Sequence, residues 1–324
     1  AEIRPDFEDG RADREICGQA KMTRWQPASD TIAAGTRAAL LRRIRRYFET
    51  AGVLEVDTPA LSPYAASDTQ IDSFEIVQSQ VSPSPLFLNT SPEFCMKRLL
   101  AAGYPDIFSI CRVFRDGESG QRHQPEFTMI EWYRLGFDLR EIIDDTIAVI
   151  HTVLTNELRI SEPVIVDYRD SFLQTIDIDP LTASSEELAE AANADRDLRE
   201  AVGDHRDDWL DLLLATHIVP TFTDDRLTVI RHYPASQAAL ARLCPHDSDV
   251  ADRFEIFFGA IELANGYVEL TDAAEQSRRI DADIAERQRR NRPIRPKDVT
   301  LLAALDSGLP QCAGVAMGFE RLHM

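Results

Sequence analysis

The sequence lacks the features that mark membrane, secreted and nucleic-acid-binding proteins. In its 324 residues no apolar run is long enough to span a bilayer, and no signal-peptide pattern is present. The five cysteines are scattered, without the close pairs of a zinc site or a redox dithiol, which fits a reducing cytosol. Positive charge is scarce, because 35 lysines and arginines face 55 acidic residues for a net charge of -20. Such a surface repels nucleic acid on average, so we expect a soluble, cytoplasmic protein that does not act at a membrane.

One basic stretch stands against this acidic background. It runs from Arg278 to Lys297, RRIDADIAERQRRNRPIRPK, and overlaps a charged helix predicted over Thr271 to Arg290. A run of arginines can bind RNA, but it is more often the solvated face of a helix. We therefore interpret this stretch as an exposed helix face.

The stretch from Phe108 to Phe137 has the strongest pattern in the chain. On either side of an eleven-residue linker, Asp116 to Glu126, the residues alternate with a period of two. This predicts an antiparallel hairpin with a long connection, and a long loop in a compact domain usually has a function. Arg115 shares one face with Ser109, Cys111 and Val113, and the return strand carries Phe127, Met129, Glu131 and Tyr133 on one face.

The linker of this hairpin combines cations, acids and residues that shape the backbone. It holds Asp116, Gly117, Glu118, Gly120, Arg122, His123 and Pro125. A guanidinium on a strand end, a cationic loop and an aromatic face suit a flat, phosphorylated ligand. The alternative is a surface hairpin that binds nothing.

Before the hairpin, the pattern predicts an extension, a helix and a short strand. Residues 1–30 are polar, acidic and aperiodic, which is typical of a disordered extension. Thr31 to Ala51 has helical spacing, and Gly52 ends that helix. The run VLEVDTPAL, closed by Pro59, predicts a short strand.

A second helix is predicted from Glu93 to Ala102, after the start signal Thr90-Ser91-Pro92-Glu93. Its first turn places Ser91 and Glu93 beside free backbone donors, where a zwitterionic or cationic small molecule could bind. Simple capping without a ligand is the commoner use of such a sequence, and both interpretations stay open.

After the hairpin, helical patterns predominate. An amphipathic helix is predicted over Asp138 to Leu158, and the acidic segment near residues 167–219 predicts a helical insertion without recognisable chemistry. A strand is predicted from Leu227 to His232, and HYPASQAALARL predicts a loop followed by a helix.

The second informative stretch is Phe254 to Thr271, FEIFFGAIELANGYVELT. If Asn265-Gly266 is a two-residue hairpin turn, Glu262 lies opposite Glu269. If Gly266 instead marks a bulge in one continuous strand, the two glutamates share a face. Either geometry requires a cation between them, and oxygen-only ligands indicate magnesium. The alternative is two solvated glutamates on an edge hairpin.

The chain ends with LPQCAGVAMGFERLHM, in which Gly314 and Gly318 flank a short predicted strand. A helix beginning at Glu320-Arg321 would stop at Met324 before it completes a stable length. We expect either a truncated chain end or a frayed last turn.

Three of these stretches resemble, in order, the three signature motifs of class II aminoacyl-tRNA synthetases: VLEVDTPAL, CRVFRDGESGQRHQPEFTMIEWYR and GVAMGFER. A fourth, IELANGYVELTDAAEQ, resembles the acidic segment of the lysyl branch. The resemblance runs from about Thr36 to Met324 and implies one catalytic domain over residues 31–324. It also implies an α+β fold with an antiparallel sheet flanked by helices, ATP and Mg²⁺ as cofactors, and a homodimer formed through the first motif.

Within the lysyl branch, the chain resembles the stand-alone paralogues, because too few residues precede the first motif for an anticodon-binding domain. Such paralogues activate a lysine and pass it to a lysine side chain of elongation factor P, so the acceptor would be that protein and not tRNA. Ala316 stands where synthetases of this branch carry a second glycine, and its methyl group favours (R)-β-lysine over α-lysine. The alternatives are an enzyme that acylates tRNA or a small amine, and a non-catalytic paralogue that senses an amino acid or a nucleotide.

The resemblance also implies roles for single residues. Arg115 would bind the α-phosphate and the substrate carboxylate, Phe127 and Arg321 would sandwich the adenine, and His123 would reach the terminal phosphates. Glu262 and Glu269 would hold magnesium and, with Arg115 and Arg321, form the catalytic set. The remaining ATP-binding positions are Asp116, Gly117, Glu118, Gln124, Leu263 and Gly318, and the lysine pocket comprises Ser91, Pro92, Glu93, Tyr133, Glu269 and Ala316.

The chain departs from the family pattern in the loop of the second motif. Family members often have Asn-Glu after the motif arginine and Asn before Pro-Glu-Phe, whereas this chain has Asp116-Gly117-Glu118 and Gln124. The third motif has Glu320 in place of aspartate, a milder change. The implied roles are therefore firmer on the strands than in the loop.

Overall fold

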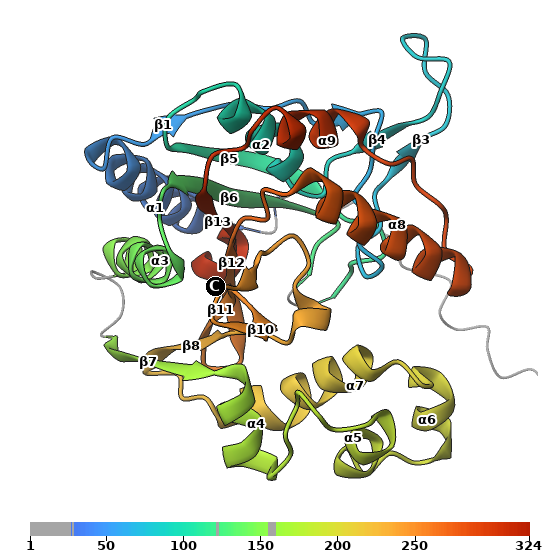
Figure 1. Cartoon of the computed structure of the whole chain (residues 1–324). Coiled ribbons are helices and arrows are strands. Elements are labelled where there is room, and N and C mark those ends of the chain that lie inside the picture. The colour runs from blue at the N-terminus through green and yellow to red at the C-terminus, as the bar shows by residue number, and fades with distance from the viewer. Residues whose placement is uncertain (1–26, 28, 121–122, 155–159) are drawn as a thin grey trace, which may run out of the picture. The chain divides into compact units, whose positions relative to one another are not determined.

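A mixed sheet of eight strands is the main element of the computed structural model, counted over the residues that it describes (Figure 1). The strand order is β1-β5-β6-β13-β12-β11-β8-β7. The strands are β1 (Leu54–Glu55), β5 (Ile107–Phe114), β6 (Glu126–Leu135), β7 (Ser161–Asp167), β8 (Arg226–Arg231), β11 (Arg253–Phe258), β12 (Ile261–Val268) and β13 (Cys312–Gly318). The predicted α+β class, with a sheet flanked by helices, is confirmed.

The structure describes residues 27, 29–120, 123–154 and 160–324. The chain divides into two compact units, residues 1–39 and 40–324, and the sheet belongs to the second unit. The predicted extension over residues 1–30 lies almost wholly outside the described residues, as do Arg122 of the motif loop and the predicted end of the helix at residues 155–158.

Most neighbouring strands of the sheet are antiparallel, but both edge strands are parallel to their neighbours. β1 pairs parallel with β5, and β7 pairs parallel with β8. Parallel neighbours need a crossover of a dozen or more residues. The chain passes through α2 between β1 and β5, and through α4 to α7 between β7 and β8, so both crossovers are long enough.

One face of the sheet packs against residues 40–50 of α1 (Thr31–Thr50), α3 (Leu139–Leu154) and α10 (Phe319–His323). In the second unit α1 contributes the buried residues Leu40, Ile44 and Phe48, and the ring of Phe48 stacks on Phe108 with centroids 4.5 Å apart. Ile130 and Trp132 of β6 belong to this core. Because side chains alternate along a strand, Met129, Glu131 and Tyr133 point to the opposite face.

That opposite face is covered only in part. α2 (Glu93–Ala101) and α9 (Val299–Asp306) pack over its β5 side through Met96, Leu100, Leu301 and Leu305. Glu131 and Tyr133, which lie on the same face, line a cleft instead. The strands therefore carry a hydrophobic core on one side and polar side chains for a site on the other.

A group of short helices has a core of its own. These helices are α4 (Tyr168–Ile176), α5 (Ser185–Ala191), α6 (Arg196–Val202) and α7 (Arg206–Leu213), followed by a π-helical turn, Leu214–Ile218, and a 3₁₀ turn, Val219–Thr221. Tyr168, Phe172 and Trp209 are buried there together with Phe257 of β11. The predicted insertion boundaries near 167 and 219 stay a prediction.

The prediction of a helix after His232 is wrong. The chain forms a 3₁₀ turn at Ala235–Gln237 and then a hairpin of β9 (Leu243–Cys244) and β10 (Asp247–Ala251). Its backbone is held by the tertiary structure, because Arg242 donates from its amide to Val268 and Ala241 forms a bridge with Glu269. Tertiary pairing thus overrides the helix propensity of the alanines.

A small sheet joins β2 (Leu61–Ser62), β4 (Leu86–Leu88) and β3 (Glu75–Ile76), in that order. Among the described residues no helix is both long and apolar enough to cross a membrane.

The basic stretch lies mainly on α8 (Ala273–Arg289), where its cations bind acids of the same chain. Arg278 and Arg289 are 69% and 65% exposed, which agrees with a solvated face. Arg287, in contrast, is fully buried and binds the Asp72 carboxylate and the Asp68 carbonyl. The interpretation as an exposed helix face is therefore wrong for Arg287, which ties α8 to the loop before β3.

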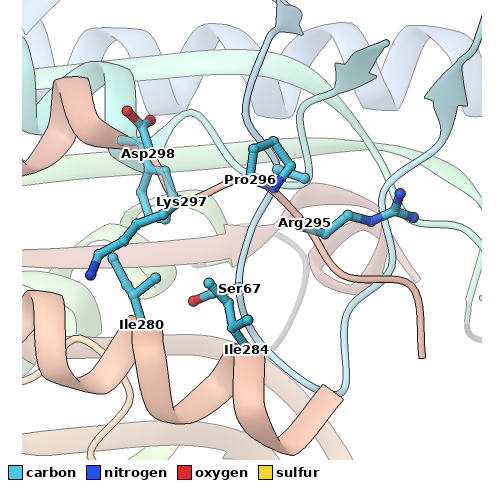
Figure 2. A pocket seen from close by; sticks show the side chains of 9 residues that line it. Ser67, Ile280, Ile284, Arg295, Pro296, Lys297 and Asp298 are labelled. Atoms are coloured by element: carbon cyan, nitrogen blue, oxygen red, sulfur yellow. The ribbon is translucent and has the colours of Figure 1, made fainter. Parts of the chain in front are cut away.

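The segment after α8 folds back over that helix (Figure 2). Lys297 binds Asp281 of α8 with 2.7 Å between Nζ and Oδ1, and Arg295 binds Glu75 of β3 with 2.8 Å between Nη1 and Oε2. The side chains around this contact enclose a cavity of about 10 Å³, which is too small for any substrate. This cavity is a packing feature.

We expect Gly266→Ala to destabilise the protein by about 1 to 3 kcal/mol. A Cβ atom at Gly266 would lie 2.7 Å from the Phe254 ring and 2.9 Å from the Gly314 carbonyl oxygen. Gly35→Ala is the matched control, because no atom of the described residues lies within 4 Å of its Cβ position and alanine favours helix by about 0.5 to 1 kcal/mol. Urea unfolding of both variants measures the difference, and equal midpoints would contradict the prediction.

Candidate active site

A cleft of about 1010 Å³ opens over the polar face of the sheet. Its floor contains residues of β6, β13 and β12, and its walls contain loop 66–71, α7, the turn 235–240 and α8. The predicted site residues that line it are Glu93, Arg115, Glu118, His123, Gln124, Phe127, Tyr133, Glu262, Leu263, Glu269, Ala316, Gly318 and Arg321. Segments far apart in the chain therefore meet at one site.

Four predicted site residues do not line this cleft: Ser91, Pro92, Asp116 and Gly117. Ser91 accepts from the Glu93 amide at 2.9 Å and donates to Glu131 at 2.7 Å, so it supports a lining residue. The Asp116 amide donates to the Asp72 carbonyl at 2.8 Å, and Gly117 follows with φ +83°. These two residues shape the start of the motif loop.

The floor of the cleft consists of rows of residues across three paired strands. Tyr133, Gly314 and Tyr267 form one row, and Glu131, Ala316 and Asn265 form the next. Gly314 leaves no room for a side chain, since a Cβ atom there would lie 2.5 Å from Glu269 Oε1 and 2.5 Å from the Tyr133 ring. The Ala316 methyl group stands between two polar side chains of the floor.

Glu262 and Glu269 reach the cleft from β12 and from the residue that directly follows it. The alternative with a turn at Asn265-Gly266 is wrong, because β11 and β12 are joined at Gly259-Ala260, between Phe258 and its partner Ile261. The alternative with a bulge is correct, but the extra residue is Leu263, since Ile256 pairs with Ala264 and Phe257 with Glu262. Gly266 instead makes room for the Phe254 ring. The prediction therefore found the strand that contains the bulge, but it assigned the bulge to the wrong residue.

The outer part of the cleft, defined by Arg115, Glu118, His123, Phe127, Glu262 and Arg321, carries paired cations. Arg115 lies over the Phe127 ring, 5.2 Å from its centroid, and its Nη1 is 3.5 Å from Glu118 Oε1. Arg321 Nη1 is 3.1 Å from Glu262 Oε2, and its Nη2 is 2.9 Å from His123 Nε2. Both guanidinium groups are partly exposed, so an anionic ligand can reach them.

The inner pocket, defined by Glu93, Lys97, Glu131, Tyr133, Tyr267 and Glu269, is a buried network of acids, hydroxyls and one ammonium group among the described residues. Lys97 Nζ lies 2.7 Å from Glu93 Oε1 and 2.5 Å from Glu269 Oε2. Tyr267 donates to Glu93 Oε1 at 2.5 Å, and Tyr133 donates to Glu131 Oε1 at 2.8 Å. Glu269 Oε1 has no hydrogen-bond partner within the described part of the chain.

Burial makes the charged forms of two of these acids costly. It raises the pKa of Glu131 to about 8, and the nearby Glu93 carboxylate adds to the effect. Burial likewise raises the pKa of Glu269 to about 8, even though the Lys97 ammonium opposes the shift. Burial alone would lower the pKa of Lys97, but Glu269 and Glu93 outweigh it and raise that pKa. The pocket therefore favours a ligand that brings positive charge.

A family model described as tRNA synthetases class II (D, K and N) matches residues 24–324. The chain belongs to this family. The match covers the motif hairpin, β12 and the last helix, which are the segments that meet in the cleft.

Curated relatives share about two-fifths of the residues of this chain. This chain is 43% identical over 303 residues to a protein of Mannheimia succiniciproducens named elongation factor P–(R)-β-lysine ligase, and the match covers 93% of this chain and 92% of the relative. Proteins of the same name from Photorhabdus laumondii and Pseudoalteromonas translucida are 42% and 43% identical, with 92% and 93% of their lengths covered. In each case the match covers 93% of this chain.

Sequence reasoning missed two side chains that line the cleft, Asn265 and Tyr267, and gave no role to Glu131. It also missed Lys97, which does not line the cleft itself but binds two acids that do. Lys97 stands four residues after Glu93, a spacing that is typical of an exposed helical ion pair. Only the packing of α2 on the sheet reveals that it is buried. Tyr267 could have been found, because it stands two residues before Glu269 and so shares its face of the strand.

The residues proposed for Mg²⁺ fit this ion in donor chemistry, because they offer oxygen atoms. Glu262 is 38% exposed at its side chain and gives one oxygen to Arg321. Glu269 gives Oε2 to Lys97, which leaves Oε1. Asn265 Oδ1 is a further buried oxygen without a hydrogen-bond partner in the described segments.

We expect Glu131→Gln to stabilise the ligand-free protein at high pH while it weakens amino-acid binding. The pKa of Glu131 is raised from 4.5 to about 8 by folding, so the folded state holds a proton that the unfolded chain has lost. Stability from this group is therefore full below about pH 4.5 and declines as pH rises toward about 8. The variant should gain about 1 to 3 kcal/mol over the natural protein near pH 8.5 and much less near pH 5.

Urea unfolding of both proteins at the two pH values measures this effect. An equal loss of stability at both values would show that Glu131 is a packing residue whose charge does not matter.

Proposed function

We propose that this chain activates a lysine with ATP and transfers it to a lysine side chain of elongation factor P. A carboxylate oxygen of the amino acid would attack the α-phosphorus of ATP and expel pyrophosphate. The acceptor amine would then attack the carbonyl carbon of the adenylate and expel AMP. The observation that carries the proposal is one cleft that joins an acidic inner pocket to an outer part with two accessible guanidinium groups. The names of the curated relatives support it.

The outer part suits ATP. Arg115 would bind the α-phosphate and the substrate carboxylate, giving up its weak contact with Glu118 for a charge that grows in the transition state. Phe127 and Arg321 would enclose the adenine, and Glu118 with its neighbours would contact the adenine edge. His123, next to Arg321, would reach the terminal phosphates. Glu262 and the Glu269 carboxylate would hold Mg²⁺, which neutralises phosphate charge when bound.

The inner pocket suits the amino acid. Its buried acids need positive charge, and Glu269 Oε1 is free to accept a hydrogen bond from a substrate ammonium group. Glu131 is already held by Ser91 and Tyr133, so its oxygens are fixed before the substrate enters. Such an arrangement orients the substrate carboxylate toward Arg115, and proximity of the reacting atoms supplies much of the acceleration.

We also propose (R)-β-lysine as the preferred isomer, a homodimer as the working form, and the cytoplasm as the location. The isomer proposal rests on Ala316, whose methyl group lies between Glu131 and Asn265 on the pocket floor. An acceptor protein rather than tRNA is proposed because the relatives are named for elongation factor P.

The direct test is isotope exchange between pyrophosphate and ATP with each lysine isomer and Mg²⁺. We expect exchange that requires a lysine, with (R)-β-lysine favoured. Incubation with elongation factor P should then increase the mass of that protein by one lysyl group, whereas tRNA should stay unacylated. Lysine binding without any exchange would indicate a sensor and would rule out the proposed enzyme.

We expect Ala316→Gly to shift the preference toward α-lysine. Removing one methyl group from the pocket floor changes discrimination by about 1 to 3 kcal/mol, which corresponds to roughly 10-fold to 200-fold. The ratio of kcat/KM for the two isomers in pyrophosphate exchange is the measurement. Leu302→Val on α9, outside the cleft, is a control that should keep the natural ratio. An unchanged ratio in Ala316→Gly would show that this position does not select the isomer.

A further inference from the structure

Lys97 contributes the ammonium group of the inner pocket, and the proposed function gives this group no role. Its side chain is 1% exposed, although lysine is rarely buried unless it is paired. It binds Glu93 and Glu269 at 2.7 Å and 2.5 Å, and Nζ lies 5.6 Å from the centroid of the Tyr267 ring. Lys97 therefore offsets the charge of these two carboxylates from the protein side.

The arginines that line the cleft have acids of their own. Arg115 pairs with Glu118, Arg206 with Asp207, Arg253 with Glu255, Arg279 with Glu275, Arg289 and Arg290 with Glu286, and Arg321 with Glu262. None of these acids belongs to the inner pocket as defined above. Within the described residues, Lys97 is thus the internal counter-charge of Glu93, Glu131 and Glu269.

The charges of the inner pocket do not balance in the absence of a ligand. Glu131 is 2% exposed and accepts from the hydroxyls of Ser91 and Tyr133, which carry no charge. Glu269 is 2% exposed and keeps Oε1 unpaired among the residues described. Glu93 completes the acids, so three carboxylates meet one ammonium in this part of the described structure. In the ligand-free pocket Glu131 and Glu269 can hold protons, because their pKa values are raised to about 8, and once both are ionised the pocket lacks two positive charges.

We propose that Lys97 is a specificity-determining residue, which sets the charge of the inner pocket so that it accepts an amino acid with two ammonium groups. The inference rests on the proposed function and adds to it a reason for choosing diamino over monoamino substrates. A diamino acid supplies both missing charges, whereas a monoamino acid of the same length leaves a buried carboxylate uncompensated. Without Lys97, even a diamino acid would leave one carboxylate unpaired. The substrate carboxylate does not enter this balance, because Arg115 lies in the outer part.

A charge-setting role makes a prediction that a packing role does not. Lys97→Met removes one positive charge and should raise the KM for lysine about tenfold or more, with a much smaller change in the KM for ATP. Glu93→Gln removes one negative charge instead. It should reduce the preference for lysine over norleucine, its monoamino counterpart.

The double variant Glu93→Gln with Lys97→Met decides between the two roles. The double variant has two carboxylates and no ammonium group, so its pocket lacks two positive charges, as the natural pocket does, and the new side chains are neutral and of similar volume. Both the affinity for lysine and the preference for lysine over norleucine should therefore return toward natural values. If Lys97 only supports packing, the losses of the single variants add, and the double variant is the worst of the three.

The experiment is calorimetric binding of lysine and norleucine, together with pyrophosphate exchange, for the natural protein and these variants. Lys297→Met is the matched control, because Lys297 pairs with Asp281 away from the cleft and its loss should leave the preference unchanged. Binding does not require catalysis, so a natural protein that binds lysine selectively but fails in exchange would refute the enzyme and leave the charge test valid.

Either of two results would overturn the inference: lysine affinity of Lys97→Met within about threefold of natural, or a double variant that recovers neither affinity nor preference. Thermal melting checks the folding of each protein. If Lys97→Met does not fold, Glu93→Gln and the double variant still decide, because the preference must fall in the first and return in the second.

Discussion

The ion pairs of Lys97 with Glu93 and Glu269 are the constraint on which the cleft depends. They connect α2 to the end of β12, two elements that are far apart in the chain. A lysine buried without acids would be too costly to keep, and the acids without the lysine would repel one another. The row of residues beneath these ion pairs excludes a larger central side chain, because a Cβ atom at Gly314 would collide with Glu269 and with the Tyr133 ring. Charge and packing therefore fix the inner pocket together.

The outer part of the cleft follows a different principle. Its guanidinium groups are held by partly exposed acids, whose interactions are weak because water screens them. A ligand with more negative charge can displace such partners at little cost. The cleft thus combines an inner end that is rigid before binding with an outer end that can exchange its contacts, as a reaction with a departing anion requires.

Much of this architecture could be predicted from the sequence, because it depends on local patterns. The motif hairpin alternates with a period of two, and β5 and β6 pair as that alternation requires, with Val113 opposite Phe127. The helices α1, α2 and α8 begin and end within a residue or two of their predicted bounds. The features that were predicted wrongly depend on tertiary contacts. The bulge at Leu263 is fixed by pairing with β11, and β9 exists because its hairpin is held against Val268 and Glu269.

The candidate site divides in the same way. Residues on strands, such as Phe127 and Tyr133, could be placed because strand periodicity assigns a face. Lys97 could not, since nothing in a helical spacing distinguishes a buried ammonium from a solvated one. Arg287 is a similar case, because an arginine-rich helix gives no sign of which member is buried on Asp72.

The two rows of the cleft floor differ in how freely they can change during evolution. In the row of Tyr133, Gly314 and Tyr267, any enlargement of the central residue collides with an acid that holds the buried lysine. In the adjacent row the central residue is Ala316, which already carries a methyl group and has the side chains of Glu131 and Asn265 beside it. The shape of the pocket can therefore drift at one position without disturbing the charges. A family built on this floor can exchange one substrate skeleton for another while it retains the same demand for cations.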